Sequence, residues 1–259
     1  MLPCVDICGL SVTRLILGAN PFAGFSHQNP ERDRDMRSYY TAERIIETFK
    51  RAEKAGINTL ITNNETEHVV QAVDTYLSSG GQLQWIAQLS MRKIRNMFKA
   101  VDRAVNMGAQ AVYFHGALID EAYLKRNRDT VKAWFDYARS RNVPAGAAGH
   151  SPEAHLWIDS LGVADFHAVS FFNCGSLHEG EGDTFRLEDM KPAVEAVGMI
   201  RKPCIAYKIM GAGRIEPHMA FDYAFRNIKP GDAVNVGMHR GDNDNIVEEN
   251  VSIVKEIIQ

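Results

Sequence analysis

The sequence predicts a single (β/α)8 barrel over residues 1–259. Its length suits one α/β barrel, whereas two ordinary domains would each be small. Eight short runs rich in Val, Ile, Ala and Phe alternate with longer segments of helical period, and this alternation is typical of βαβ units. We therefore expect one domain in which helices follow the strands around a closed barrel.

The expected strands are short apolar runs bounded by polar residues or glycine. They are Arg14–Gly18, Ile57–Thr62, Gln84–Leu89, Ala111–His115, Val143–Ala148, Phe166–Phe172, Cys204–Met210 and Ala233–Met238.

Helix starts between the strands carry recognisable signals. Thr41 can cap the helix that presents Ile45 and Phe49, and Ser151 precedes Pro152 as a cap before a proline in the first turn. Glu216-Pro217 predicts a similar start. The last helix places an apolar stripe against the barrel, made of Val247, Val251, Val254 and Ile258.

Composition and charge exclude several classes of function. Apolar residues make up 45% and charged residues 24%, and the net charge of −3 gives no field that attracts phosphates, so nucleic acid is not an expected partner. No apolar run has membrane-spanning length, so we expect a cytoplasmic protein without a membrane partner. The four cysteines lack zinc-ligand spacing and are expected to be reduced.

Two long segments, Asn20–Tyr39 and Asn173–Arg186, follow strands and are expected to be irregular. Active sites of barrels are built from the loops at the carboxyl ends of the strands. These two segments are therefore expected to form lids or walls over a small-molecule substrate.

Three segments resemble the aldo-keto reductases. Leu10–Gly18 is similar to the hairpin that leads into the first strand, and Ile45–Asn58 to the first helix and its exit. Val236–Arg240, followed by Glu248–Val251, resembles the last strand and the helix that recognises NADP. The resemblance implies a barrel with a short N-terminal hairpin and an NADP-dependent oxidoreductase.

The catalytic residues of that family are mostly missing. Ile61 and Thr66 stand where the family has Asp and Tyr, and Trp85–Ser90 contains no lysine. Only the family's histidine has a match, His115. Gly149-His150 replaces the Ser-Asn pair that usually holds the nicotinamide.

Other positions imply cofactor binding. By resemblance, Tyr207 would stack on nicotinamide, and Arg240, Glu249 and Asn250 would recognise the adenosine end of NADP. A glycine turn before a helix can also bind a phosphate. Such a turn is expected between the strand Cys204–Met210 and the helix that starts near Pro217, and it contains Gly211, Gly213 and Arg214. The alternative is a plain turn without a ligand.

Polar residues at strand ends give a candidate site independent of any family. We expect His115, His150 and Lys208 to be catalytic, because imidazole carries protons near neutral pH and a lysine is costly to bury. Lys208 could serve as a Schiff-base amine, a general base or an oxygen clamp, or form a structural ion pair, and the histidines could be structural. The expected substrate-binding residues are His27, Asn63, Asn64, Gln88 and Asn173.

Two enzymatic functions follow, and the first of them is preferred. One is an NADP-dependent oxidoreductase with a substitute acid, acting on a small carbonyl or sugar-like compound. The other is a lyase, isomerase or hydrolase that uses the strand-end histidines and Lys208, with or without a divalent metal, for which we assign no ligands. A binding or regulatory protein is a third alternative, disfavoured by the polar strand ends. We draw no expectation about oligomeric state.

Overall fold

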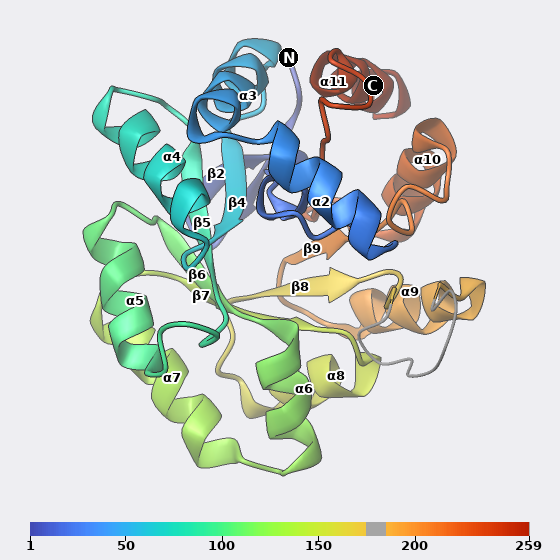
Figure 1. Cartoon of the computed structure of the whole chain (residues 1–259). Coiled ribbons are helices and arrows are strands. Elements are labelled where there is room, and N and C mark those ends of the chain that lie inside the picture. The colour runs from blue at the N-terminus through green and yellow to red at the C-terminus, as the bar shows by residue number, and fades with distance from the viewer. Residues whose placement is uncertain (175–184, 259) are drawn as a thin grey trace.

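The computed structural model describes residues 1–174 and 185–258 and contains a closed barrel of parallel strands surrounded by helices (Figure 1). The barrel order is β10-β3-β4-β5-β6-β7-β8-β9, which closes the sheet on itself. The strands are β3 (Leu15–Gly18), β4 (Thr59–Asn63), β5 (Gln84–Leu89), β6 (Ala111–Phe114), β7 (Ala145–Gly149), β8 (Phe166–Ser170), β9 (Cys204–Tyr207) and β10 (Ala233–Gly237). The expected (β/α)8 fold is confirmed.

The N-terminal hairpin is confirmed as well. Strands β1 (Cys4–Ile7) and β2 (Leu10–Thr13) pair antiparallel. Ile7 and Val12 are fully buried and belong to one apolar cluster with Ile16, Ile61 and Ile86 of the barrel strands. The hairpin therefore covers the interior at the amino ends of the strands, which leaves the carboxyl ends for a site.

Helices cover the outside of the barrel, and their amphipathic faces bury apolar stripes against the strands. The outer helices are α3 (Ala42–Ala55), α4 (Glu67–Ser78), α5 (Met97–Asn106), α6 (Gly116–Leu124), α7 (Arg128–Ser140), α8 (Pro152–Leu161), α9 (Met190–Met199), α10 (Pro217–Asn227) and α11 (Ile246–Ile257). Two further helices, α1 (Asn20–Ala23) and α2 (Pro30–Tyr39), follow β3, and a short 3-10 turn spans Leu187–Asp189.

The expected caps are confirmed. The side chains of Thr41 and Ser151 accept the N–H groups of Arg44 and Ala154, and the Glu216 carboxylate caps α10. The stripe of the last helix is also present, with Val247, Val251 and Val254 buried and Ile258 partly buried.

The expectation that Asn20–Tyr39 is irregular was wrong. This segment forms α1 and α2, and the Asn29 side chain caps α2 by accepting the Arg32 N–H, with Pro30 in the first turn. In Figure 1, α2 lies over one side of the barrel mouth, inside the ring of outer helices. The other long segment, Asn173–Arg186, lies mostly outside the described residues, which end at 174 and resume at 185.

Four strands end earlier than expected, two of them at residues of the candidate site. The strand expected to include His115 ends at Phe114, because His115 is the cap of α6. The strand expected to run to Met210 ends at Tyr207, because Lys208 adopts a left-handed backbone with φ 55°. The expected run to Phe172 ends at Ser170, and the other bounds differ by up to two residues.

Among the helices that the structure describes, none combines the length and hydropathy needed to cross a bilayer.

Candidate active site

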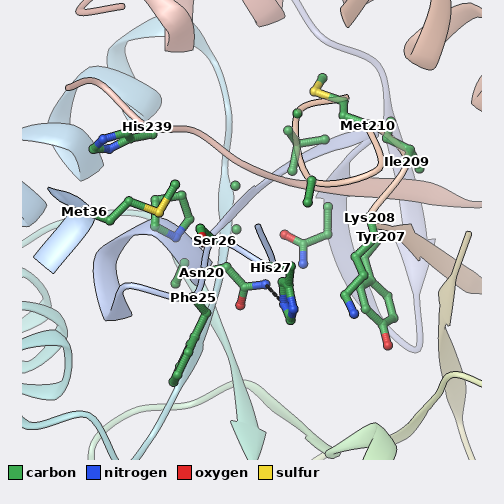
Figure 2. A pocket seen from close by; sticks show the side chains of 18 of the residues that line it. Asn20, Phe25, Ser26, His27, Met36, Tyr207, Lys208, Ile209, Met210 and His239 are labelled. Atoms are coloured by element: carbon green, nitrogen blue, oxygen red, sulfur yellow. Dashed lines mark hydrogen bonds between the residues drawn. The ribbon is translucent and has the colours of Figure 1, made fainter. Parts of the chain in front are cut away.

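A cavity with two lobes opens at the carboxyl ends of the barrel strands. The α2 lobe, about 280 Å³, lies toward β3, β9 and β10 and is bordered by Arg32 and Met36 of α2. The histidine lobe, about 220 Å³, contains His115 and His150. Residues that line both lobes are Asn20, Phe25, His27, Asn63, Gln88, Tyr207 and Lys208. Figure 2 shows Asn20, His27, Tyr207 and Lys208 gathered on one side of the cavity, opposite Met210 and His239.

His150 is held by a buried carboxylate. Asp120 of α6 accepts the Nδ1–H of His150 at 2.8 Å and also accepts the backbone N–H of His150. Burial lowers the pKa of His150 and outweighs the opposing hydrogen bond to Asp120, so the ring is neutral near pH 7. A neutral ring that donates from Nδ1 carries a lone pair on Nε2. His150 is therefore arranged as a proton acceptor.

His115 has the opposite arrangement. Its Nδ1 accepts the backbone N–H of Ala117 at 3.1 Å. Burial, with smaller effects from His150 and Arg92, lowers its pKa to about 4, so the neutral ring carries its proton on Nε2. His115 is thus arranged as a hydrogen-bond donor. The ring centroids of His115 and His150 lie 6.2 Å apart, so one small substrate can meet both.

Lys208 faces the same space. Neighbouring residues of a strand point to opposite faces, yet Tyr207 and Lys208 both line the cavity because the left-handed backbone at Lys208 redirects its side chain. Its Nζ donates to the backbone carbonyl of Asn173 at 2.9 Å. Burial lowers the pKa of Lys208 to about 8.

His27 and Asn63 lie between the lobes. The Nε2 atom of His27 is 3.3 Å from the Nδ2 atom of Asn20, and burial, with a further effect from Lys208, lowers the pKa of His27 to about 3. The Asn63 side-chain oxygen accepts the N–H groups of Glu65 and Thr66, which fixes the turn after β4. Together with Gln88, these residues form a neutral polar floor.

Glu65 fixes one wall of the histidine lobe. Its buried carboxylate accepts the Ser90 hydroxyl and the backbone N–H groups of Arg92, Lys93 and Ile94. Burial raises the pKa of Glu65, but these hydrogen bonds outweigh burial and lower it overall. The loop after β5 is therefore tied to the end of β4.

We expect Glu65→Gln to lower the free energy of unfolding by about 1–3 kcal/mol, because an amide NH2 would face backbone donors. Urea unfolding measures this change. The matched control is Glu67→Gln, since Glu67 is exposed in the first turn of α4, and its effect is expected to stay within about 0.5 kcal/mol. Equal effects of the two substitutions would contradict the role given to Glu65.

Two expected substrate-binding residues do not face the cavity. Asn64 is fully buried and donates from Nδ2 to the Ala100 carbonyl of α5, because it lies on the outer face of the barrel wall. Asn173 contributes its backbone carbonyl to Lys208, and its N–H donates to Asp189. His27, Asn63 and Gln88 line the cavity.

Most positions that the resemblance assigned to NADP are occupied by contacts within the chain. The Arg240 guanidinium is buried and pairs with Glu47 at 2.7 Å and Asp244 at 2.6 Å. Glu249 is exposed and accepts from Asn243, and Asn250 is buried on the inner face of α11.

The glycine turn after β9 is also satisfied internally. The N–H groups of Gly211 and Gly213 donate to the Lys208 and Met210 carbonyls, and Arg214 donates to the carbonyls of His27 and Gly211. Tyr207 and Gly213 line the α2 lobe. These residues do not fit an open dinucleotide groove, since a phosphate would compete with two carboxylates at Arg240, and the N–H groups of Gly211 and Gly213 already donate to carbonyls of the turn.

A divalent metal has no evident ligand set in the part of the chain that the structure describes. There, no group of three or more His, Cys, Asp or Glu side chains is arranged to hold a metal ion. The carboxylates of Glu65 and Asp120 are used by internal hydrogen bonds.

Sequence reasoning missed Asp120, the partner of His150. The available signal was a carboxylate inside the apolar helix segment Gly116–Leu124, on the helix that follows His115. It also missed Arg92, which lines the histidine lobe and lowers the pKa of His115.

No protein-family model matches the chain, and no curated protein matches it in sequence. Solved structures do match its fold. A Pseudomonas aeruginosa protein provisionally described as an aldo-keto reductase is 17% identical with a TM-score of 0.68, over 99% of this chain and 95% of that one. The apo form of Gox0644 is 10% identical with a TM-score of 0.63, over 100% of this chain and 94% of that one. QR15, described as an aldolase, is 16% identical with a TM-score of 0.53, over 84% of this chain and 89% of that one. At these identities the likeness shows a shared (β/α)8 barrel fold.

Proposed function

We propose that this chain is an acid–base enzyme of the lyase or isomerase class that moves a proton at the carbon beside a carbonyl group. The observation that carries the proposal is the buried Asp120–His150 pair, with its ring in the histidine lobe beside His115 and Lys208. The two histidines have opposite proton positions, as proton transfer next to a polarised carbonyl requires.

In this mechanism His115 donates from Nε2–H to the substrate's carbonyl oxygen. Because the ring is neutral and sits at the start of α6, it polarises the carbonyl without becoming charged. His150 takes the proton from the neighbouring carbon at Nε2, and Asp120 stabilises the resulting imidazolium. In an isomerase, His150 then returns the proton to the same or a neighbouring carbon. In a lyase, the electron pair left on the carbon forms a double bond and expels a leaving group from the next carbon, and His150 gives its proton to that group.

The test is exchange of substrate hydrogen for solvent deuterium. Pyruvate, dihydroxyacetone phosphate and dihydroxyacetone are each incubated with the protein in D2O, and loss of the signal of the hydrogens beside the carbonyl is followed by proton NMR. We expect exchange of at least one probe well above the rate in buffer. Exchange of all three at the buffer rate would overturn the proposal.

An NADP-dependent oxidoreductase is the second candidate, favoured by Tyr207 on the wall of the cavity and by the fold shared with the aldo-keto-reductase-like neighbour. Titration with NADPH, followed by cofactor fluorescence with NADH as control, separates the candidates. We expect no saturable binding in the micromolar range. Micromolar binding that is lost in Arg240→Met would favour the oxidoreductase instead.

A further inference from the structure

We propose that Lys208 forms an imine with the carbonyl carbon of a small anionic substrate. This inference rests on the proposed acid–base function and names the bond and the substrate class that it would use. It draws on the position of the lysine, the charges of the histidine lobe and the neighbouring rings.

Lys208 is placed where a substrate in either lobe would meet it. It lines both lobes, directly after β9, and its Nζ lies 2.9 Å from the Asn173 carbonyl and 6.0 Å from the centre of the Tyr207 ring. In Figure 2, Lys208 and Tyr207 extend side by side toward the same end of the cavity. The left-handed backbone that aims the amine costs free energy in a residue other than glycine, and such strain gathers at functional positions.

The surroundings favour the nucleophilic form of this amine. Burial lowers the pKa of Lys208 to about 8, against smaller opposing effects of Cys174, Asp120 and Asp189. Roughly a tenth of the amine is then neutral at pH 7. Neutral rings of His150 and His115 lie in the same lobe, ready to accept and to donate a proton.

The chemistry balances without a further reactant. The ammonium of Lys208 loses a proton to His150, and the neutral nitrogen attacks the carbonyl carbon while the C=O pair moves to oxygen, which accepts the His115 Nε2–H hydrogen bond. The oxygen then receives one proton from the nitrogen and one from protonated His150. The C–O bond breaks, water leaves, and the nitrogen electron pair forms the C=N bond. Ammonium and ketone give iminium and one water, with no change in oxidation state. The iminium then acidifies the neighbouring C–H bond for His150.

The charges of the histidine lobe select an anion. Arg92 and Lys93 are exposed and line its rim, and Lys208 lines the same lobe. Among the described residues that line this lobe, the carboxylate is Glu65, and four internal donors already occupy it. A substrate that carries a carboxylate or phosphate would therefore meet a positive rim. The lobe volume of about 220 Å³ suits a compound of a few carbon atoms.

The test traps the iminium with cyanoborohydride. The protein is incubated with pyruvate, dihydroxyacetone phosphate or dihydroxyacetone, and adducts are located by mass spectrometry of peptides. We expect one adduct, at Lys208, formed at least tenfold faster with an anionic probe than with neutral dihydroxyacetone. The faster of the two anionic probes identifies carboxylate or phosphate as the recognised group. Trapping should rise with pH around a midpoint of about 8, because the neutral amine is the nucleophile.

Variants complete the test. Lys208→Arg should abolish the adduct. Arg92→Gln should slow trapping of the anionic probes about tenfold and leave trapping of dihydroxyacetone unchanged. Lys99→Arg, on the exposed surface of α5, should leave the trapping of every probe unchanged. Adducts spread over surface lysines of the unaltered protein would overturn the imine, and this result needs no variant to fold. Deuterium exchange that persists in Lys208→Arg would reject the imine but keep the acid–base function, whereas absence of both exchange and adduct would reject both.

Discussion

His150→Gln is expected to slow deuterium exchange by about 10²–10⁴-fold, the usual contribution of a general base. The exchange is measured on whichever of pyruvate, dihydroxyacetone phosphate and dihydroxyacetone the unaltered protein exchanges. Gln keeps a polar side chain but has no basic nitrogen, so it cannot take the proton that Nε2 accepts. Proton NMR in D2O measures the effect, and circular dichroism checks that the fold is kept.

Two further variants show whether the loss arises from base catalysis. Asp120→Asn should reduce exchange in the same direction, because an amide can donate to His150 Nδ1 and favour the wrong tautomer. His218→Gln, on the exposed face of α10, should leave exchange unchanged. If His150→Gln kept the full rate, His150 would be structural and the proposed function would fail.

The fold could be predicted from sequence because its signals are local. Each strand is an apolar run and each helix has an apolar stripe, and Thr41, Ser151 and Glu216 mark helix starts within three residues of their partners. The same reasoning missed α2, although Asn29-Pro30 is a similar signal, because the charged run that follows lacks an apolar stripe.

Part of the candidate site could be predicted from the sequence. Positions at strand ends could be predicted, whereas contacts between residues far apart in the sequence could not. His115, His150 and Lys208 stand at strand ends, so topology alone brings them to one mouth. The ion pairing of Arg240 could not be predicted, because one of its partners, Glu47, lies far away in the sequence on α3. Only the folded barrel brings that carboxylate to the guanidinium.

The proton positions of the two rings are likewise a property of the fold. His115 faces a backbone N–H of its own helix, whereas His150 faces a carboxylate four residues into that helix, and this difference makes one ring a donor and the other an acceptor. One helix, α6, thus orients both rings. A substitution at the start of α6 should therefore disturb the site although neither histidine is replaced.

Gly116→Ala is such a change, and we expect it to slow exchange by about 10²-fold. A Cβ atom at Gly116 would lie 2.6 Å from Cε1 and 2.8 Å from Nδ1 of His150, closer than real contacts allow. The clash forces the ring to tilt, although its 2.8 Å hydrogen bond to Asp120 holds it in place. The tilt weakens this hydrogen bond and displaces Nε2. The rate of deuterium exchange measures this displacement at a residue that takes no part in the chemistry.

Gly198→Ala is the matched control, because a Cβ atom there meets no atom within 4 Å and Gly198 lies inside α9. This variant should raise the free energy of unfolding by about 0.5–1 kcal/mol, as alanine favours a helix, and leave exchange unchanged. Both substitutions add one Cβ atom to a helix, and only the one at Gly116 meets the His150 ring. Normal exchange in Gly116→Ala would mean that the orientation of His150 by Asp120 does not control the reaction.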